Sequence, residues 1–213
     1  MYGMNTTLNH IQPLTAYDYL VDKLIFQIDN KSIELGYGDK ICFVNHDKES
    51  ISDTIVKGLL PKRFGGLESQ NILVITDDSY GFDFYQCVSI AKKRYGMDIN
   101  KILDNTIIIR LFTIYQLAKT IIYDLVKLIK KFKSKLVVVI SDLFLLNSQT
   151  TTISQHKYKQ IGRGNKKEID WNVKQIIESL NKITKSIVVV FSSISIPNFM
   201  NYEKSTTNVI RYR

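Results

Sequence analysis

Short apolar runs rich in β-branched residues alternate along this chain with longer segments of helical period. Six runs predict strands, because each is bounded by polar or turn residues. They lie at residues 40–44, 72–76, 106–110, 136–141, 187–192 and 206–212. In the runs at 72–76, 136–141 and 187–192 the apolar residues are near-continuous, so both faces of these strands are expected to be covered. The run at 206–212 mixes polar and apolar residues, which is typical of an edge strand.

The segments between these strands each carry one apolar helical face. In the segment that follows the strand at 40–44, this face consists of Ile51, Ile55, Val56, Leu59 and Leu60. Between residues 114 and 132 it consists of Leu117, Ile121, Leu125, Leu128 and Phe132, and between 165 and 185 of Ile169, Val173, Ile176, Leu180 and Ile183. Gly96 suits a left-handed cap after a helix at 84–95, and Asn165 with Glu168 resembles a capping box. We therefore expect one α/β domain over residues 1–213, with helices on both faces of a mostly parallel sheet.

Composition adds one functional indication. The chain has 213 residues, of which 45% are hydrophobic and 23% are charged, so a disordered chain, collagen and a coiled coil are excluded. No apolar run is long enough for a membrane span, and the N-terminus does not resemble a secretory signal, so a cytoplasmic protein is expected. The net charge of +9 favours an anionic partner such as nucleic acid, although solubility alone would also explain it.

The residues that most often carry chemistry are scattered. Cys42 and Cys87 are far apart and lie in apolar surroundings, so buried free thiols are expected. The three histidines, His10, His46 and His156, show no metal-ligand spacing. No metal site is predicted.

The loop after the strand at 40–44 stands where a phosphate-binding loop would lie. Such a loop needs Gly-x-x-x-x-Gly-Lys-Ser/Thr, but here Asn45 and Ser50 replace the glycines and Ile51 replaces the lysine. Only Ser52 fits the pattern. Asp47 and Glu49 would repel a triphosphate, although Lys48 could reach a phosphate from elsewhere in the loop. We therefore predict that neither ATP nor Mg²⁺ is a cofactor.

Several further motifs occur in a recognisable order. Gly65-Gly66-Leu67 precedes a strand that ends in Asp77-Asp78, Gly96-Met97-Asp98 forms a turn, and Asp104-Asn105 precedes a strand that ends at Arg110. Lys135 begins an apolar run that ends in Ser141-Asp142, and Ile161-Gly162-Arg163-Gly164 leads into the last long helix. Over residues 40–213 this succession resembles the RecA/RadA recombinase family, reduced to the ATPase core of an archaeal-type RadA paralog.

The resemblance implies a RecA-like core, with residues 1–39 as a divergent N-terminal part and no separate DNA-binding domain. It also implies that Asp78 stands in place of the catalytic glutamate and that Asp142 is the Walker B carboxylate. Asp78 is one methylene shorter than glutamate, and Ser192-Ser193 replaces the Asn-Gln of the family's second DNA loop. Both carboxylates are therefore interpreted as vestigial, and the chain is not expected to be an enzyme.

The segment 156–167 contains five cations and no acid. Glycines on either side of Arg163 allow close backbone approach to phosphates, and Tyr158 can stack on an unpaired base. Together with the resemblance, this predicts a DNA-binding loop, with single strands favoured. Its contact residues are Lys157, Tyr158, Lys159, Gly162, Arg163, Gly164, Lys166 and Lys167. The alternative is a solvated basic loop. The lysines at 127, 130, 131, 133 and 135 are interpreted as structural, because cations favour a helix C-terminus. Trp171 is expected to be mostly buried, and the alternative is an interface anchor.

The first functional hypothesis is a non-catalytic RadA-like paralog, located in the cytoplasm at the nucleoid. It would bind DNA and a related recombinase or paralog, as a homodimer or heterodimer, and act in recombinational repair. The second is a weak ATPase that uses Lys48, Ser52, Asp78 and Asp142 in unusual geometry. The third is a scaffold subunit without DNA affinity.

Overall fold

The computed structural model describes residues 23–28, 31–44, 48–76, 83–141, 166–192 and 207–211. The strands are β1 (Leu24–Ile28), β2 (Lys31–Leu35), β3 (Lys40–Val44), β4 (Asn71–Thr76), β5 (Thr106–Leu111), β6 (Leu136–Ile140), β7 (Ile187–Ser192) and β8 (Thr207–Arg211). The helices are α2 (Lys48–Leu59), the 3₁₀ turn η1 (Lys62–Phe64), α3 (Phe84–Tyr95), α4 (Ile99–Asp104), α5 (Ile114–Lys119), the π-helical turn η2 (Thr120–Asp124), α6 (Leu125–Phe132) and α8 (Lys166–Asn181).

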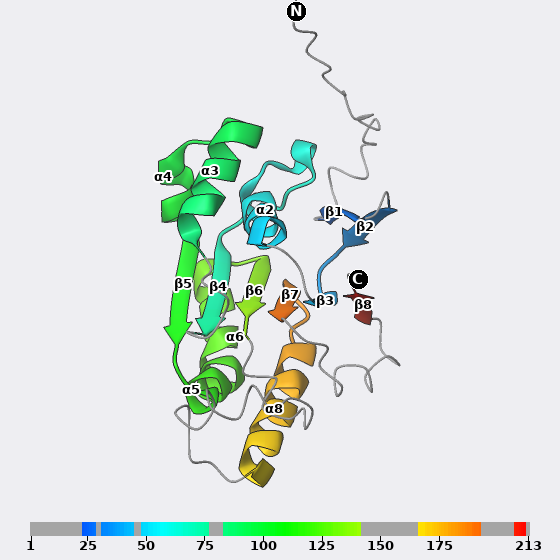
Figure 1. Cartoon of the computed structure of the whole chain (residues 1–213), viewed down its shortest axis with the longest axis vertical. Coiled ribbons are helices and arrows are strands. Elements are labelled where there is room, and N and C mark those ends of the chain that lie inside the picture. Colours follow the sequence, from blue (N-terminus) through cyan, green and yellow to red (C-terminus); the bar gives the residue numbers. More distant parts are fainter. Residues whose placement is uncertain are drawn as a thin grey trace, which may run out of the picture.

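Six strands form one parallel sheet in the order β5-β4-β6-β7-β3-β8 (Figure 1). The α/β prediction is confirmed, and β8 lies at an edge as its mixed sequence indicated. Because all six strands run the same way, β3, β4, β6 and β7 end along one edge of the sheet, called here the carboxyl edge. The opposite edge, where the strands begin, is called the amino edge.

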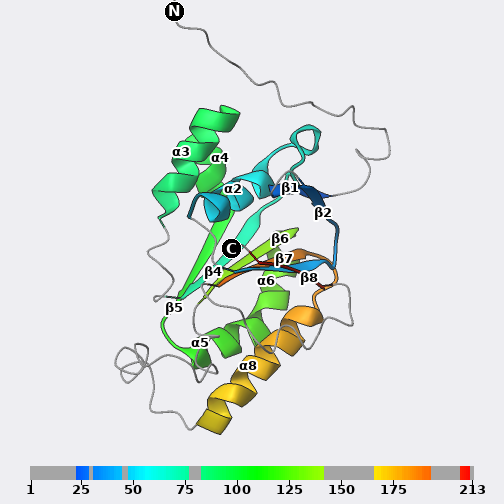
Figure 2. The same ribbon diagram turned by 45° about the vertical axis from the view of Figure 1, so that its right-hand side comes forward.

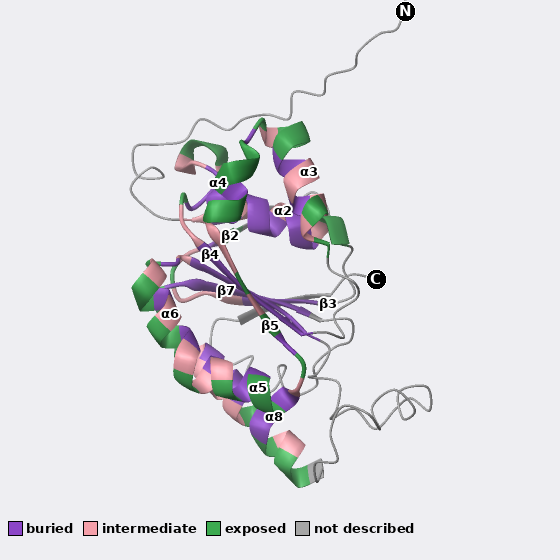
Figure 3. Cartoon of the chain, turned by 90° about the vertical axis from the view of Figure 1, so that its left-hand side faces the viewer, coloured by how far each residue is buried: buried purple, intermediate pink, exposed green. Residues whose placement is uncertain are grey.

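Helices cover both faces of the sheet (Figures 2 and 3). The layer on one face consists of α2, α3 and α4, and the layer on the other consists of α5, η2, α6 and α8. Successive strand residues point to opposite faces, so Leu73 and Ile75 pack in the first layer while Ile72 and Val74 pack in the second. This double burial explains the near-continuous apolar strands.

The boundaries of α3 follow its capping residues. The Asp83 side chain accepts a hydrogen bond from Tyr85 N (2.9 Å), and Gly96 closes the helix with a left-handed φ of 59°. The predicted helix at 84–95 and its glycine cap are confirmed. Asn165, the first residue of the predicted capping box, lies outside the described residues.

The segment 114–132 is helical throughout, but the expected face is displaced in its second half, although Leu128 still packs against the core. The π-helical turn η2 interrupts the segment, and a π turn holds one residue more than an α turn. The apolar face therefore advances by one position: Ile129 is buried, while Leu128 and Phe132 are only half-buried.

Strands β1 and β2 were not predicted. They form a separate antiparallel pair in which Leu24 lies opposite Leu35, and both leucines are buried in the core beneath α2. The expectation for Trp171 was wrong, because its side chain is 57% exposed. The face of α8 that packs on the sheet consists of Val173, Ile176, Ile177 and Leu180, and Trp171 lies on the opposite face.

Candidate functional site

The carboxyl edge is where a sheet of this kind holds its ligands. Three segments named by the sequence begin there: the loop after β3, the Asp77-Asp78 pair after β4, and Asp142 after β6. Asn45, Asp78 and Asp142 themselves lie outside the described residues. The described residues next to them lie in α2 and at the ends of β4 and β6.

Helix α2 follows β3 after a short connection. It starts at Lys48, with only three residues between it and Val44, the last residue of β3. Ser50, Ile51 and Ser52, which align with the second glycine, the lysine and the hydroxyl of a working loop, all lie inside the helix. Lys48 occupies the first helical position, and its side chain is exposed.

The side chains of Ile51 and Ser52 point into the protein. Ile51 is 5% exposed and belongs to the core of the first layer. Ser52 is completely buried, and its hydroxyl donates to the Lys48 carbonyl (2.9 Å). Burial raises the pKa of the Cys87 thiol on α3 to about 11, and a hydrogen bond with the Ser52 side chain opposes this rise. In this arrangement Ser52 joins α2 to α3.

An ion-pair network, called here the α2–α3 clamp, joins the same two helices. Glu49 forms an ion pair with Arg94. Asp53 accepts a hydrogen bond from the Tyr95 hydroxyl (2.8 Å) and forms ion pairs with Lys57 (3.0 Å) and Arg94 (3.6 Å). Burial, the charge of Asp53 and the hydrogen bond to it raise the pKa of Tyr95. Glu49 is thus engaged with a cation of its own protein.

Sequence reasoning missed this clamp. Glu49, Asp53 and Lys57 recur every four residues, which places them on one face of α2. That spacing could have predicted the Asp53–Lys57 pair, but Arg94 and Tyr95 come from α3, and only the packing of the two helices brings them near.

Two buried hydroxyls join the strands that carry the carboxylates. Thr76 ends β4 and Ser141 follows β6, and the Thr76 hydroxyl donates to the Ser141 hydroxyl (3.2 Å). β4 and β6 are neighbours in the parallel sheet, with Ile75 paired to Ile140. The two strand ends expected from the sequence therefore meet at the carboxyl edge.

Comparison with known families decides the assignment. The sequence model of the Rad51 family matches residues 15–202, which is most of the chain. The chain belongs to the Rad51 family. A search of curated proteins found no match. Membership agrees with the parallel sheet and its two helical layers, which form a RecA-type ATPase core, and it suggests a recombinase-like role in recombination and repair.

Most residues of the predicted DNA-binding loop of this Rad51-family chain lie outside the described residues. These are Lys157, Tyr158, Lys159, Gly162, Arg163 and Gly164. Lys166 and Lys167 form the beginning of α8, and Lys167 is exposed. In the described part of the chain, no helix is long and apolar enough to cross a bilayer.

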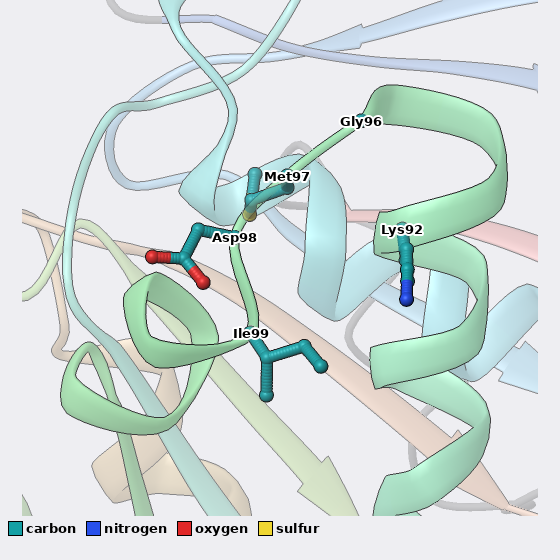
Figure 4. Close-up of a pocket in the computed structure, with 5 residues that line it drawn as sticks. All are labelled: Lys92, Gly96, Met97, Asp98 and Ile99. Atoms are coloured by element: carbon teal, nitrogen blue, oxygen red, sulfur yellow. The ribbon is translucent and has the colours of Figure 1, made fainter.

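A hollow of about 510 Å³ lies where α3 turns into α4, away from the carboxyl edge. Figure 4 shows its lining residues, with the Lys92 ammonium and the Asp98 carboxylate on opposite sides. The Asp98 carboxylate already serves as the N-cap of α4, because it accepts a hydrogen bond from the Asn100 N–H (3.3 Å). The hollow therefore contains no converging polar groups, and none of the nucleotide-site or DNA-binding residues predicted from the sequence lines it.

Proposed function

We propose that this chain is a non-catalytic member of the Rad51 family, a paralog that assists homologous recombination without hydrolysing ATP. The observation that carries the proposal is the state of α2: it starts at Lys48, and it buries the one hydroxyl that fits a phosphate loop, that of Ser52. Ile51 is also a core residue where the family has a lysine. Both observations support a chain that does not hold a nucleoside triphosphate with Mg²⁺.

DNA is the proposed anionic partner, contacted by the loop that contains Lys157, Lys159 and Arg163 and by the start of α8. Family membership and the net charge of +9 support this assignment. A related recombinase is the proposed protein partner, since a core that has given up its own nucleotide chemistry can still dock against an intact relative.

DNA binding is tested by titrating labelled single- and double-stranded oligonucleotides at several salt concentrations. Five phosphate contacts on a single strand predict a slope of log K against log salt of about −3.5. Replacing Lys157, Lys159, Arg163, Lys166 and Lys167 with alanine should abolish most of the affinity. The matched control replaces Lys127, Lys130 and Lys131 on α6 with alanine, and it should change the affinity far less. Equal losses in both variants would show that net charge alone attracts DNA.

The proposal that the chain does not bind ATP is tested by measuring its melting temperature with and without millimolar Mg-ATP. A ligand of the folded state raises stability by mass action, so we expect no shift for the parent chain. A shift that disappears in the Lys48→Ala variant would contradict the proposal and favour the weak ATPase. Binding to a Rad51-family recombinase without any affinity for DNA would instead favour the scaffold function.

A further inference from the structure

A second hollow, of about 390 Å³, lies at the amino edge, where β4, β5 and β6 begin. Four segments converge on it: the end of α2, the turn before β4, the end of α4, and the turn between α6 and β6. Its lining residues are Leu59, Glu68, Ser69, Gln70, Lys101, Asn105, Phe132, Lys133 and Lys135. It is called here the amino-edge hollow, and it shares no residue with the candidate site.

The charged residues of this hollow are three lysines and one glutamate. Lys135 Nζ donates to the Leu67 carbonyl (3.2 Å), whereas no ion pair within the described ranges involves Lys101 or Lys133. The C-terminus of α6 lies here too, but its Ile129 carbonyl already accepts from the N–H groups of Lys133 and Ser134. One terminal carbonyl of α6 is therefore satisfied by the backbone, and the lysines beside this helix end can also attract an anion.

The backbone is held in an uncommon conformation at this hollow. Glu68 and Lys133 have φ angles of 48° and 50°, and in the part of the chain that the structure describes they are the only non-glycine residues with positive φ. Both line the amino-edge hollow. Lys133 occupies the position after α6 where glycine is usual. Such conformations concentrate at ligand clamps, because the surrounding structure must hold them in place.

Hydrogen bonds fix the walls of the hollow relative to one another. The Ser134 hydroxyl donates to the Gln70 carbonyl (2.8 Å), and the Lys135 N–H donates to the Ser69 hydroxyl (2.9 Å). The Asn71 N–H donates to the Asn105 carbonyl (2.9 Å), which joins the end of α4 to the start of β4. The segments that supply the lysines are thus positioned before any ligand arrives.

We propose that the amino-edge hollow binds a small ligand that carries several phosphate groups. Lysine ammonium groups bind phosphates as point charges, and the half-buried Phe132 offers apolar surface to the remainder of such a ligand. The volume lies within the range of small-molecule sites, and the concave shape suits a compact ligand better than a duplex backbone. The site is independent of the candidate site at the carboxyl edge.

The test is a calorimetric titration of the full chain with tripolyphosphate at low salt, in parallel with Lys101→Gln, Lys133→Gly and Lys127→Gln variants. Lys133→Gly should weaken binding at least about tenfold while its melting temperature stays equal or rises, because glycine adopts a positive φ freely. Lys101→Gln should also weaken binding. Lys127, which pairs with Asp124 and does not line the hollow, provides the control of equal charge, and its variant should bind within about twofold of the parent.

Three results would overturn the proposal. The first is the absence of tripolyphosphate binding, and the second is equal affinity in the parent and both hollow variants. The third is an equal loss in Lys127→Gln, which would mean that only net charge attracts the anion. A duplex oligonucleotide that loses affinity in Lys133→Gly, with no response to tripolyphosphate, would assign the surface to nucleic acid and also refute a small-ligand site. None of these results bears on ATP or on the DNA loop.

Discussion

At the scale of single residues, Gly58 and Asn71 decide how closely α2 approaches the sheet. Asn71 is fully buried at the start of β4, and its side-chain amide donates to the Ile55 carbonyl of α2 (2.6 Å). A Cβ atom at Gly58 would collide with the Asn71 side chain and with Leu136. The helix can lie this close to β4 only because position 58 has no side chain.

The first prediction concerns Gly58→Ala. In an open helix this change usually stabilises by about 0.5–1 kcal/mol. Here the inserted methyl overpacks the contact, so we expect a net loss of about 1–2 kcal/mol in the free energy of unfolding. Urea denaturation monitored by circular dichroism measures the difference. A Gly58→Ala variant that is as stable as the parent, or more stable, would show that the helix can move away from β4 at little cost.

At the scale of elements, the α2–α3 clamp holds the start of α2 in place. Asp53 is its centre, with 19% of its side chain exposed, and it accepts from Tyr95, Lys57 and Arg94. Truncating Asp53 leaves the half-buried Tyr95 hydroxyl without this acceptor.

The second prediction is that Asp53→Ala lowers the free energy of unfolding by about 1–3 kcal/mol, the usual effect of orphaning a buried polar partner. Asp124→Ala is the matched control, because it removes the same charge from the exposed Asp124–Lys127 pair (3.7 Å) and should change stability by at most about 0.5 kcal/mol. Chemical denaturation of both variants provides the comparison. Similar effects in the two would show that the clamp contributes no more than a surface ion pair.

The same elements show what the sequence could and could not predict. Strands β4, β6 and β7 were predicted because doubly buried strands carry a near-continuous apolar run, and the end of α3 because Gly96 caps it locally. The π turn at 120–124 has no comparable local signal, so the face from Leu128 onward was displaced. The partners of Asp53 on α3 depend on helix packing, which no periodicity contains. The sequence placed the candidate site after the ends of strands β3, β4 and β6. It could not predict that Ser52 is buried, because that burial depends on where α2 begins.

At the scale of the whole molecule, the two cysteines lie in different hydrophobic cores, one on each face of the sheet. Cys42 lies in the core between the sheet and α5, α6 and α8, and Cys87 lies in the core beneath α2. Burial raises the pKa of Cys42 to about 12 and that of Cys87 to about 11, from an ordinary value of 9.0. The neutral thiols therefore stabilise the fold fully below about pH 9, and this contribution is lost as pH rises from there toward about 11 to 12.

The third prediction is a steep alkaline loss of stability. Above about pH 9, each thiol lowers the free energy of unfolding by at most about 1.4 kcal/mol per pH unit. Urea midpoints at about pH 8 and about pH 10.5 should fall less in Cys42→Ala and Cys87→Ala than in the parent, although both variants start from lower stability because of the cavity each creates. Parallel pH profiles for the parent and both variants would exclude the thiols as the source of the loss.

The pairing of β3 also dictates when this protein can finish folding during synthesis. Residues 40–44 are made early, yet their neighbours in the sheet are residues 187–192 and 207–211. Strands β4, β5 and β6 can pair as soon as residue 140 has left the ribosome, but β3 must wait until nearly the whole chain has been translated. Until then the edges of β3 lack their native partners, so we expect its apolar residues Ile41 and Phe43 to remain prone to contacts with other chains until late in synthesis.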